Sequence, residues 1–389
     1  MNRTEEYCIA IALAQAIKQK QQKKRKRLWM KECFRKRNQF THETLLNELK
    51  MGTTGDFAID EDSFEEILTL VGPKIQKQDT QMREAISPAQ RLTITLYYLA
   101  TGKSFADLKS ISYISERAIG RIVLETCNEI NNTLANYIKL PSNKDEWKKH
   151  AANIYHNSNF PNCLGVINGK HIPIRKPTKS TALNYYNYRK FFSLVLMAIV
   201  DANYEFIMVD VDTNGAVCDG YGNTTFVRTL TENGLNLPKS GILPSSEQEL
   251  PYVFVGDSGF QLTNNILTSY SQLYLSEEES IYNYRFSCAQ RIAENAFNIL
   301  LSRFKVLQRT IGLAPEKVQI IILTCCYLHN FWLRKMKQNG ICVESVNYHL
   351  STPLQRTHCR NATSSAQLVR EQFCSYFNNE GKVLWQIAN

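Results

Sequence analysis

Three polar residues stand where the chain could assemble a catalytic or metal site: Asn168, Asp257 and Glu294. Asn168 follows the apolar run 164–167 and Asp257 follows the run 253–256, so we expect each at the end of a buried strand. Ligands of α/β proteins bind at the carboxyl ends of strands. Glu294 lies on the polar side of a segment with helical periodicity, so a helix is expected to present it.

Each carboxylate also has an ordinary structural explanation. Asp257 precedes Ser258-Gly259 and alone is more simply explained as a turn or helix N-cap residue. Glu294 lies three residues after Arg291 and could form a surface ion pair worth about 0.5 kcal/mol at best. The spacing of these residues alone therefore does not distinguish a catalytic or metal site from residues with only a structural role.

The elements that would position these residues change in character along the chain. From about Thr41 to Leu140 the apolar residues recur at helical spacing, whereas β-rich runs begin after Pro161. The expected order is a strand at 163–167, a hairpin, a helix, a strand and further helices. The hairpin joins 191–200 to 205–211, the helix spans 225–233, the next strand is 252–256, and the chain is helical from there to about 339. This order predicts an all-α N-terminal region followed by an α/β domain with helices covering one sheet.

Thr101-Gly102 is expected to end one helix of the helical region, and a longer helix is expected to start near Ser115. A helix-turn-helix is one interpretation of residues 105–111 and 115–130. Two packed helices without a DNA role explain the same pattern at least as well, because residues such as Leu108 and Val123 are what a core face requires.

Positive charge is concentrated near the start of the sequence. Of the 389 residues, positions 18–37 hold eleven Lys or Arg and one acid, so this block equals the net charge of +10. Such a block is typical of an arm that neutralises nucleic-acid phosphates or of a nuclear import signal, and a solvated helix face is the alternative. The densest part is Lys23, Lys24, Arg25, Lys26 and Arg27.

Cysteine usage and hydropathy favour a reducing compartment and argue against a membrane span. The eleven cysteines form no CxxC pair and no zinc-ligand spacing. The longest apolar run, 191–200, is interrupted by Ser193 and falls short of the roughly 20 residues that a membrane helix needs. We therefore expect no membrane partner.

Several motifs occur in a fixed order, and together they resemble the PIF/Harbinger transposases and their nuclease relatives. The segment from Gly165 to His171 is similar to the family's Gly-x-Ile-Asp-Gly-x-His motif, with Asn168 at the Asp position. The other matching segments are Tyr185-Tyr186-Asn187-Tyr188-Arg189, Val255-Gly256-Asp257-Ser258-Gly259-Phe260, Asn283-Tyr284-Arg285 and Arg291 to Phe304. The resemblance implies an RNase H-like DDE nuclease domain at 141–339, built on a mixed five-stranded sheet flanked by helices. A basic arm at 1–40 and a helical domain at 41–140 precede it. A C-terminal extension at 340–389 follows.

This resemblance implies metal-dependent cleavage of a DNA phosphodiester. Two Mg²⁺ or Mn²⁺ ions roughly 4 Å apart are held by converging carboxylates in such sites. Asp257 and Glu294 match the second and third ligands, and Asn168 stands where the first, bridging carboxylate belongs. An amide offers one neutral carbonyl oxygen, so weaker metal binding and impaired cleavage are expected.

No nearby acid is expected to replace the missing carboxylate. Asp210 and Asp212 fall on the second hairpin strand, about 10 Å from the first strand at ~4.8 Å per strand. Asp201 falls at the opposite end of the neighbouring strand. Asp219 matches a recurrent Asp of the family, and no role follows for it from the sequence.

The remaining candidates concern DNA and partners. His171, three residues after Asn168, is expected on the opposite face of a continuing strand, which favours a structural or phosphate-contacting role over metal ligation. Lys170, Arg175 and Lys176 could line a DNA groove or a solvated edge. The basic block at 18–37 predicts a location in the nucleus, with the cytoplasm as a further location. The resemblance implies a Myb-like DNA-binding partner. The alternative is an inactive, domesticated transposase that binds DNA or protein.

Overall fold

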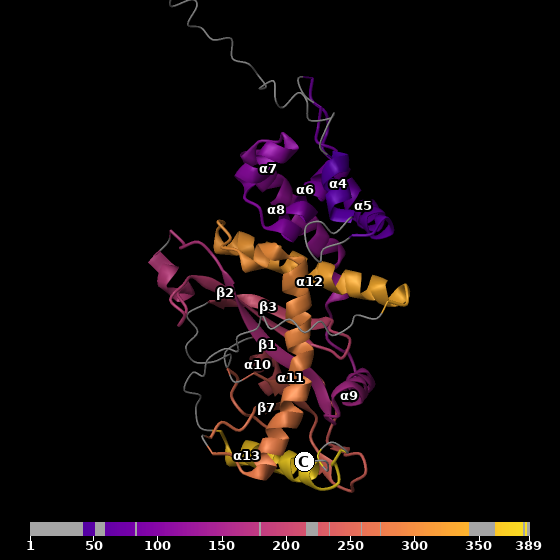
Figure 1. The fold of residues 1–389 in the computed structure, drawn as a ribbon, viewed down its shortest axis with the longest axis vertical. Coiled ribbons are helices and arrows are strands. Elements are labelled where there is room, and N and C mark those ends of the chain that lie inside the picture. The colour runs from indigo at the N-terminus through magenta and orange to yellow at the C-terminus, as the bar shows by residue number, and fades with distance from the viewer. Residues whose placement is uncertain are drawn as a thin grey trace, which may run out of the picture.

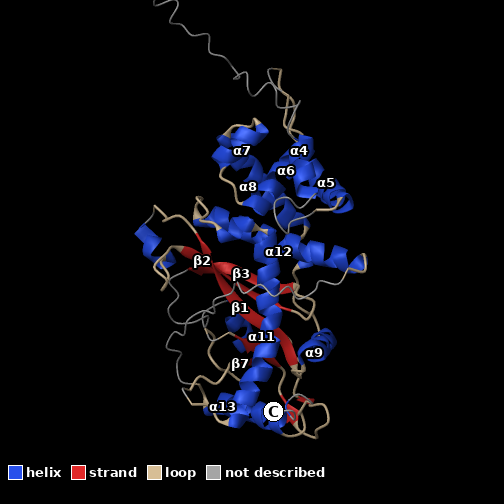
Figure 2. Ribbon diagram, viewed as in Figure 1, coloured by secondary structure: helices blue, strands red, loops and turns tan. Residues whose placement is uncertain are grey.

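The computed structural model describes residues 42–50, 59–81, 84–178, 180–214, 225–232, 234–257, 259–272, 274–341, 362–383 and 386. A helical region lies above an α/β domain in which helices flank one sheet (Figures 1 and 2). The predicted fold class, an RNase H-like mixed sheet preceded by an all-α region, is confirmed. The basic block at 18–37 and Asp219 lie outside the described residues.

The central sheet has five strands in the order β3-β2-β1-β6-β7. β2 is antiparallel to both β1 and β3, whereas β6 is parallel to β1 and to β7. The mixed five-stranded sheet is therefore as predicted. Every residue of β2 is buried, as expected for a strand covered by helices on both faces. The strands are β1 (Cys163–Pro173), β2 (Ser193–Val200), β3 (Phe206–Asn214), β6 (Val253–Gly256) and β7 (Ile266–Leu267); β4 (Gly241–Ile242) and β5 (Glu249–Leu250) form a separate pair.

Two layers of helices cover the two faces of this sheet. α11 (Glu277–Arg303) and α12 (Pro315–Gln338) cover the face that carries Val166 and Ala198. α9 (Lys144–Ser158) and α10 (Thr225–Thr231) supply residues to the core on the other face. That second core contains Ile167 and Met197, together with the buried Trp147 of α9. We call these the α11 face and the α9 face of the sheet.

The N-terminal helices pack onto α12 and form a continuous core with the sheet domain. Gly102, at a φ of 61°, ends α6 and Ser115 precedes α8, as the sequence predicts. In the interface, Thr324 of α12 donates to the Asn131 side chain over 2.8 Å. α12 thus lies between the upper helices and the sheet (Figure 1). The helices are α4 (His42–Lys50), α5 (Glu61–Ile75), α6 (Pro88–Thr101), α7 (Phe105–Ser112) and α8 (Glu116–Thr133), followed by the short 3-10 helix η1 (Ala135–Tyr137).

The sequence prediction of helix from Asp257 onward was wrong for the first part of that stretch. The described residues between Asp257 and α11 contain no helix, and they include β7. The Thr263 side chain accepts hydrogen bonds from the backbone N–H groups of Asn265 and Ile266, which fixes a turn instead of a helix. Residues 225–233 were predicted helical, and α10 ends at Thr231.

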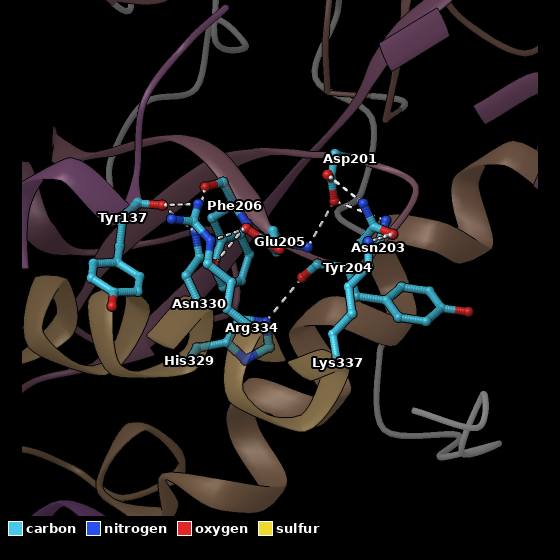
Figure 3. Close-up of polar contacts among 10 residues, drawn as sticks. All are labelled: Tyr137, Asp201, Asn203, Tyr204, Glu205, Phe206, His329, Asn330, Arg334 and Lys337. Carbon is cyan, nitrogen blue, oxygen red and sulfur yellow. Dashed lines mark hydrogen bonds and ion pairs between the residues drawn. The ribbon is translucent and has the colours of Figure 1, made fainter. Parts of the chain in front are cut away.

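The β2–β3 hairpin docks on α12 through a buried polar cluster (Figure 3). Asn330, fully buried on α12, accepts from the backbone N–H of Phe206 over 2.9 Å and donates to the Phe206 carbonyl over 2.8 Å. Arg334 donates to the Glu205 carboxylate over 2.7 Å. His329 lies 3.0 Å from the Tyr204 carbonyl, and burial lowers the pKa of this histidine to about 3. These contacts fix the antiparallel edge of the sheet relative to α12.

Part of the C-terminal extension completes the core of the sheet domain. α13 (Ser364–Asn378) packs on α11 and places Phe377 against Phe160, with ring centroids 5.0 Å apart. The buried Arg285 of α11 donates to the carbonyl of Gly381 over 2.9 Å. Two further 3-10 helices are η2 (Ser180–Tyr185) and η4 (Lys305–Gln308). None of the described helices has the length and apolar character required to cross a membrane.

Candidate active site

Asn168 and Asp257 lie side by side on adjacent strands. β1 and β6 are parallel, with Val166 opposite Val255, and the backbone N–H of Asp257 donates to the Ile167 carbonyl over 3.2 Å. Both valines belong to the core beneath α11. Because side chains alternate along a strand, Asn168 and Asp257 each lie two residues further on the same α11 face.

α11 brings Glu294 to the same face of the sheet. The helix starts with a capping box between Ser276 and Glu279, and its buried side carries Ala289, Ala293 and Ala296, whose small side chains allow close approach to the sheet. Glu294 is half-buried. Burial raises its pKa, the charge of Asp257 raises it further, and Arg291 lowers it. The two carboxylates are therefore close enough to repel, as expected for groups that share a site.

The amide of Asn168 is turned toward its own backbone. Its Oδ1 accepts a hydrogen bond from the N–H of Gly169 over 2.7 Å, and the residue is half-buried. The amide has one carbonyl oxygen, carries no charge, and its remaining polar atom is a donor. Asn168 thus lies beside Asp257 and offers little to a cation.

The donors on the α11 face do not fit two divalent metal ions as they stand. Two carboxylates converge there, the third position is an amide, and nowhere in the described chain do three or more His, Cys, Asp or Glu residues form a group that could hold a metal ion. Two dications require bridging negative charge to offset their mutual repulsion. A complete two-metal centre therefore needs a ligand that the described residues do not supply.

The neighbouring acids do not replace the missing ligand. Asp210 of β3 is opposite Met197 of β2, which faces the α9 core, so the alternation of side chains directs Asp210 away from Asn168. Asp201 follows the end of β2, and its carboxylate accepts from the backbone N–H groups of Asn203 and Glu205 over 2.9 Å each. Neither Asp210 nor Asp201 therefore faces Asn168 as a replacement ligand. Nothing is described of the Asp212 side chain or of Asp219.

His171 faces away from the candidate site, as predicted. β1 continues to Pro173 without a break in its pairing to β2, so His171 and Asn168 lie on opposite faces. The ring packs against Tyr188, and Nδ1 lies 2.9 Å from the Ser193 hydroxyl. Burial, together with the charges of Arg189 and Lys170, lowers the pKa of His171 to about 4. A neutral, packed histidine fits a structural role.

The candidate DNA-contacting residues lie along and beyond the end of β1. Lys170 is half-buried, and burial together with the charge of Arg189 lowers its pKa. Arg175 and Lys176 are exposed on the segment that follows β1. The sequence assigned no role to two half-exposed tyrosines on the neighbouring turn, Tyr186 and Tyr188. The charge of the surrounding sequence could have drawn attention to these tyrosines, because residues 147–200 contain eight Lys or Arg and no Asp or Glu.

Comparison with known proteins agrees with the fold. Residues 167–330, which include all three site positions, match the family described as DDE superfamily endonuclease. "Protein ALP1-like" of Arabidopsis thaliana is 24% identical over 325 residues, covering 81% of this chain and 79% of that protein. "Putative nuclease HARBI1" of Homo sapiens is 24% identical over 273 residues, covering 69% of this chain and 73% of that protein. No solved structure matches the chain.

The ordered motifs, the mixed sheet and these matches lead to one conclusion. The resemblance to the PIF/Harbinger transposase-derived nucleases is confirmed: residues 167–330 are similar to the DDE superfamily endonucleases, and the mixed sheet has their RNase H-like fold.

Proposed function

We propose that this protein is a Harbinger-type, transposase-derived nuclease that binds DNA in the nucleus and cleaves it poorly. The observation that carries the proposal is the geometry of one face: Asp257 and Glu294 converge beside Asn168, which has replaced the first carboxylate. Domains of this superfamily generally use divalent metals. Mg²⁺ or Mn²⁺ is the expected ion because the donors are oxygens.

A second function, DNA or protein binding without cleavage, is favoured by the contact of Asn168 with Gly169. The hydrogen bond from the Gly169 N–H satisfies the amide oxygen within the chain, so the position is stable without any cation. A domesticated protein of this kind would keep its fold and its basic surface. We further propose that a Myb-like partner supplies sequence recognition, as the family resemblance implies.

The domain boundaries are part of the same proposal. Residues 1–40 form a basic arm, 41–140 a helical domain, 141–339 the nuclease domain and 340–389 an extension. The helix-turn-helix role of α7 and α8 competes with a structural one. One side of α8, with Ile119, Val123 and Cys127, is buried in the shared core.

A plasmid assay tests this function. The full chain should shift supercoiled DNA in a mobility assay, yet produce little nicked product in Mg²⁺ or Mn²⁺ above a metal-free control. The reason is that the site lacks one of the charges that hold the ions. Asn168-Gly169 is a deamidation-prone pair, so mass spectrometry must first show intact Asn168. Robust nicking by intact protein that Asp257→Ala abolishes would contradict the impairment and reveal another ligand.

Deleting residues 18–37 should weaken non-specific DNA binding and reduce nuclear entry. The deletion removes a net charge of +10, and each lost phosphate contact lowers the log–log salt slope of duplex binding by about 0.9. Salt titrations of affinity for a random duplex, and imaging of a tagged chain, measure the two effects. An unchanged slope together with normal nuclear entry would show that the block is only a solvated surface.

A further inference from the structure

A tight turn, residues 186–192, projects from the end of the β1–β2 hairpin. We call it the tyrosine turn. Its centre is Asn187, only 2% exposed, whose side chain accepts from the N–H of Phe191 over 3.2 Å and donates to the Ser193 hydroxyl over 2.9 Å. The backbone adds two hydrogen bonds: the N–H of Asn187 donates to the Phe191 carbonyl, and the N–H of Lys190 donates to the Asn187 carbonyl. Lys190 lies in the left-handed region at a φ of 64°. The turn is therefore held in a defined conformation.

The tyrosine turn presents two aromatic rings to solvent. Tyr186 is 42% exposed and Tyr188 is 41% exposed. Their inner sides are fixed by packing: Tyr186 contacts Phe192 with ring centroids 5.1 Å apart, and Tyr188 contacts His171 at 5.6 Å. Rings held in this way lose little conformational freedom when a flat ligand stacks on them.

Two cations lie over aromatic rings of the tyrosine turn, and this stretch of the sequence contains no acid. The 54 residues from 147 to 200 contain no Asp or Glu. The Arg189 guanidinium lies 5.4 Å from the centre of the Tyr188 ring, and the Lys176 ammonium lies 6.0 Å from that of Phe192. Burial and the charge of Arg189 both lower the pKa of Lys170. This cluster of like charges would be stabilised by an anion.

A hollow of ≈ 570 Å³ reaches Tyr185, the residue that directly precedes the tyrosine turn. It lies between the segment after β1 and the start of α12. Its lining includes Arg175, Lys176 and Tyr185, the apolar Leu313 and Pro315, and one acid, Glu316. Figure 1 shows the beginning of α12 on the same side of the molecule as the end of the β1–β2 hairpin. A space of this volume, with both apolar and cationic walls, suits a nucleotide-sized group.

We propose that the tyrosine turn and this hollow bind single-stranded DNA, with bases stacked on Tyr186 and Tyr188 and phosphates on Lys176, Arg189 and Lys190. Aromatic platforms flanked by cations are how proteins bind unpaired strands. Paired bases in a duplex have no free faces, so duplex binding would use only the cations. The inference rests on the proposed function, since both require DNA as the ligand. His171, which packs under Tyr188, is three residues from Asn168 along β1, about 10 Å away, and faces the opposite side of the sheet.

Binding of a labelled oligodeoxythymidine and of a duplex of random sequence tests the inference in the full chain. Tyr186→Ala/Tyr188→Ala should weaken single-strand binding about tenfold or more, with duplex binding changed less than about twofold. Tyr186→Phe/Tyr188→Phe should restore single-strand binding because the ring faces remain. Tyr274→Ala, at a tyrosine that is 87% exposed elsewhere, is the matched control and should change neither. Lys176→Gln/Lys190→Gln should weaken the binding of both ligands and lower the log–log salt slope of each.

Three results would overturn the inference. If the double Ala variant loses affinity for the single strand and for the duplex equally, the tyrosines support the fold and do not stack on unpaired bases. An unchanged single-strand affinity would remove them from the interface, and failure of the double Phe variant to restore binding would exclude stacking. Wild-type binding to the duplex in each of these cases would leave the proposed function standing. If the wild-type chain binds neither ligand, both the inference and the proposed function fail.

Discussion

Asn168→Asp should create divalent-metal binding and measurable nicking in a chain that we expect to show little of either without the change. The change adds one negative charge beside Asp257 and Glu294. One carboxylate oxygen can still accept from the Gly169 N–H, which leaves the second oxygen for a cation. A unit charge pair at 4 Å is worth about 4 kcal/mol at an effective dielectric constant of 20. Desolvation of the ion and the carboxylate offsets much of this gain. We therefore expect Mn²⁺ affinity to rise at least tenfold, which corresponds to about 1.4 kcal/mol.

Metal binding by this variant can be measured without any cleavage assay. In the absence of divalent ions, Asn168→Asp should unfold at a lower temperature than the wild-type chain, because three carboxylates then repel one another. Added Mn²⁺ should raise the unfolding temperature of the variant much more than that of the wild type, since a ligand stabilises the folded state that binds it. Titration calorimetry with Mn²⁺ gives the affinity directly.

Two matched variants make the result specific to the site. Asn168→Ala should bind no more Mn²⁺ than the wild type, and Asn168→Asp/Asp257→Ala should lose both the added metal binding and the nicking. If Asn168→Asp shows no gain in Mn²⁺ affinity, the three positions do not form a metal site. If metal binding appears without nicking, the fold retains the site and the protein acts through binding alone.

Asn330→Ala should lower the free energy of unfolding by about 2–5 kcal/mol. Asn330 is fully buried, and its side chain bonds the N–H and the carbonyl of Phe206 as well as the carbonyl of Tyr137, the last over 2.9 Å (Figure 3). Arg334 also donates to the Tyr137 carbonyl over 2.8 Å, so that group keeps a partner. The two Phe206 groups lose their Asn330 partner, and each unsatisfied buried group costs about 1–3 kcal/mol.

Urea or guanidinium unfolding, followed by circular dichroism and extrapolated to zero denaturant, gives this free energy. Asn128→Ala is the matched control, because Asn128 is exposed in the middle of α8 and its removal should change stability by less than about 0.5 kcal/mol. A loss below about 1 kcal/mol for Asn330→Ala would show that water or a rearranged hairpin satisfies the two backbone groups.

The sequence by itself determined the elements whose signals are local. The apolar runs of β1, β2 and β6 predicted buried strands, because a strand covered on both faces needs apolar side chains throughout. Gly102 and Ser115 marked helix ends, since a left-handed residue ends a helix and a hydroxyl side chain favours its start. The order of motifs predicted the resemblance to the family, which the comparisons confirm, and it predicts that Asn168 stands in place of a carboxylate.

Only the tertiary structure decided which of these residues meet. Glu294 lies 37 residues after Asp257, and no local pattern fixes which side of a helix packs on which face of a sheet. The small buried side of α11 and the parallel pairing of β1 with β6 settle it, since they place both carboxylates beside Asn168. The sequence also did not predict that the β2–β3 hairpin docks through Asn330. The backbone groups that Asn330 bonds lie 124 and 193 residues away in the sequence, so no local pattern marks this residue as buried. Local sequence specifies strands and helix ends through short-range sterics and hydrogen bonds, whereas a site made of distant residues exists only once the core has packed.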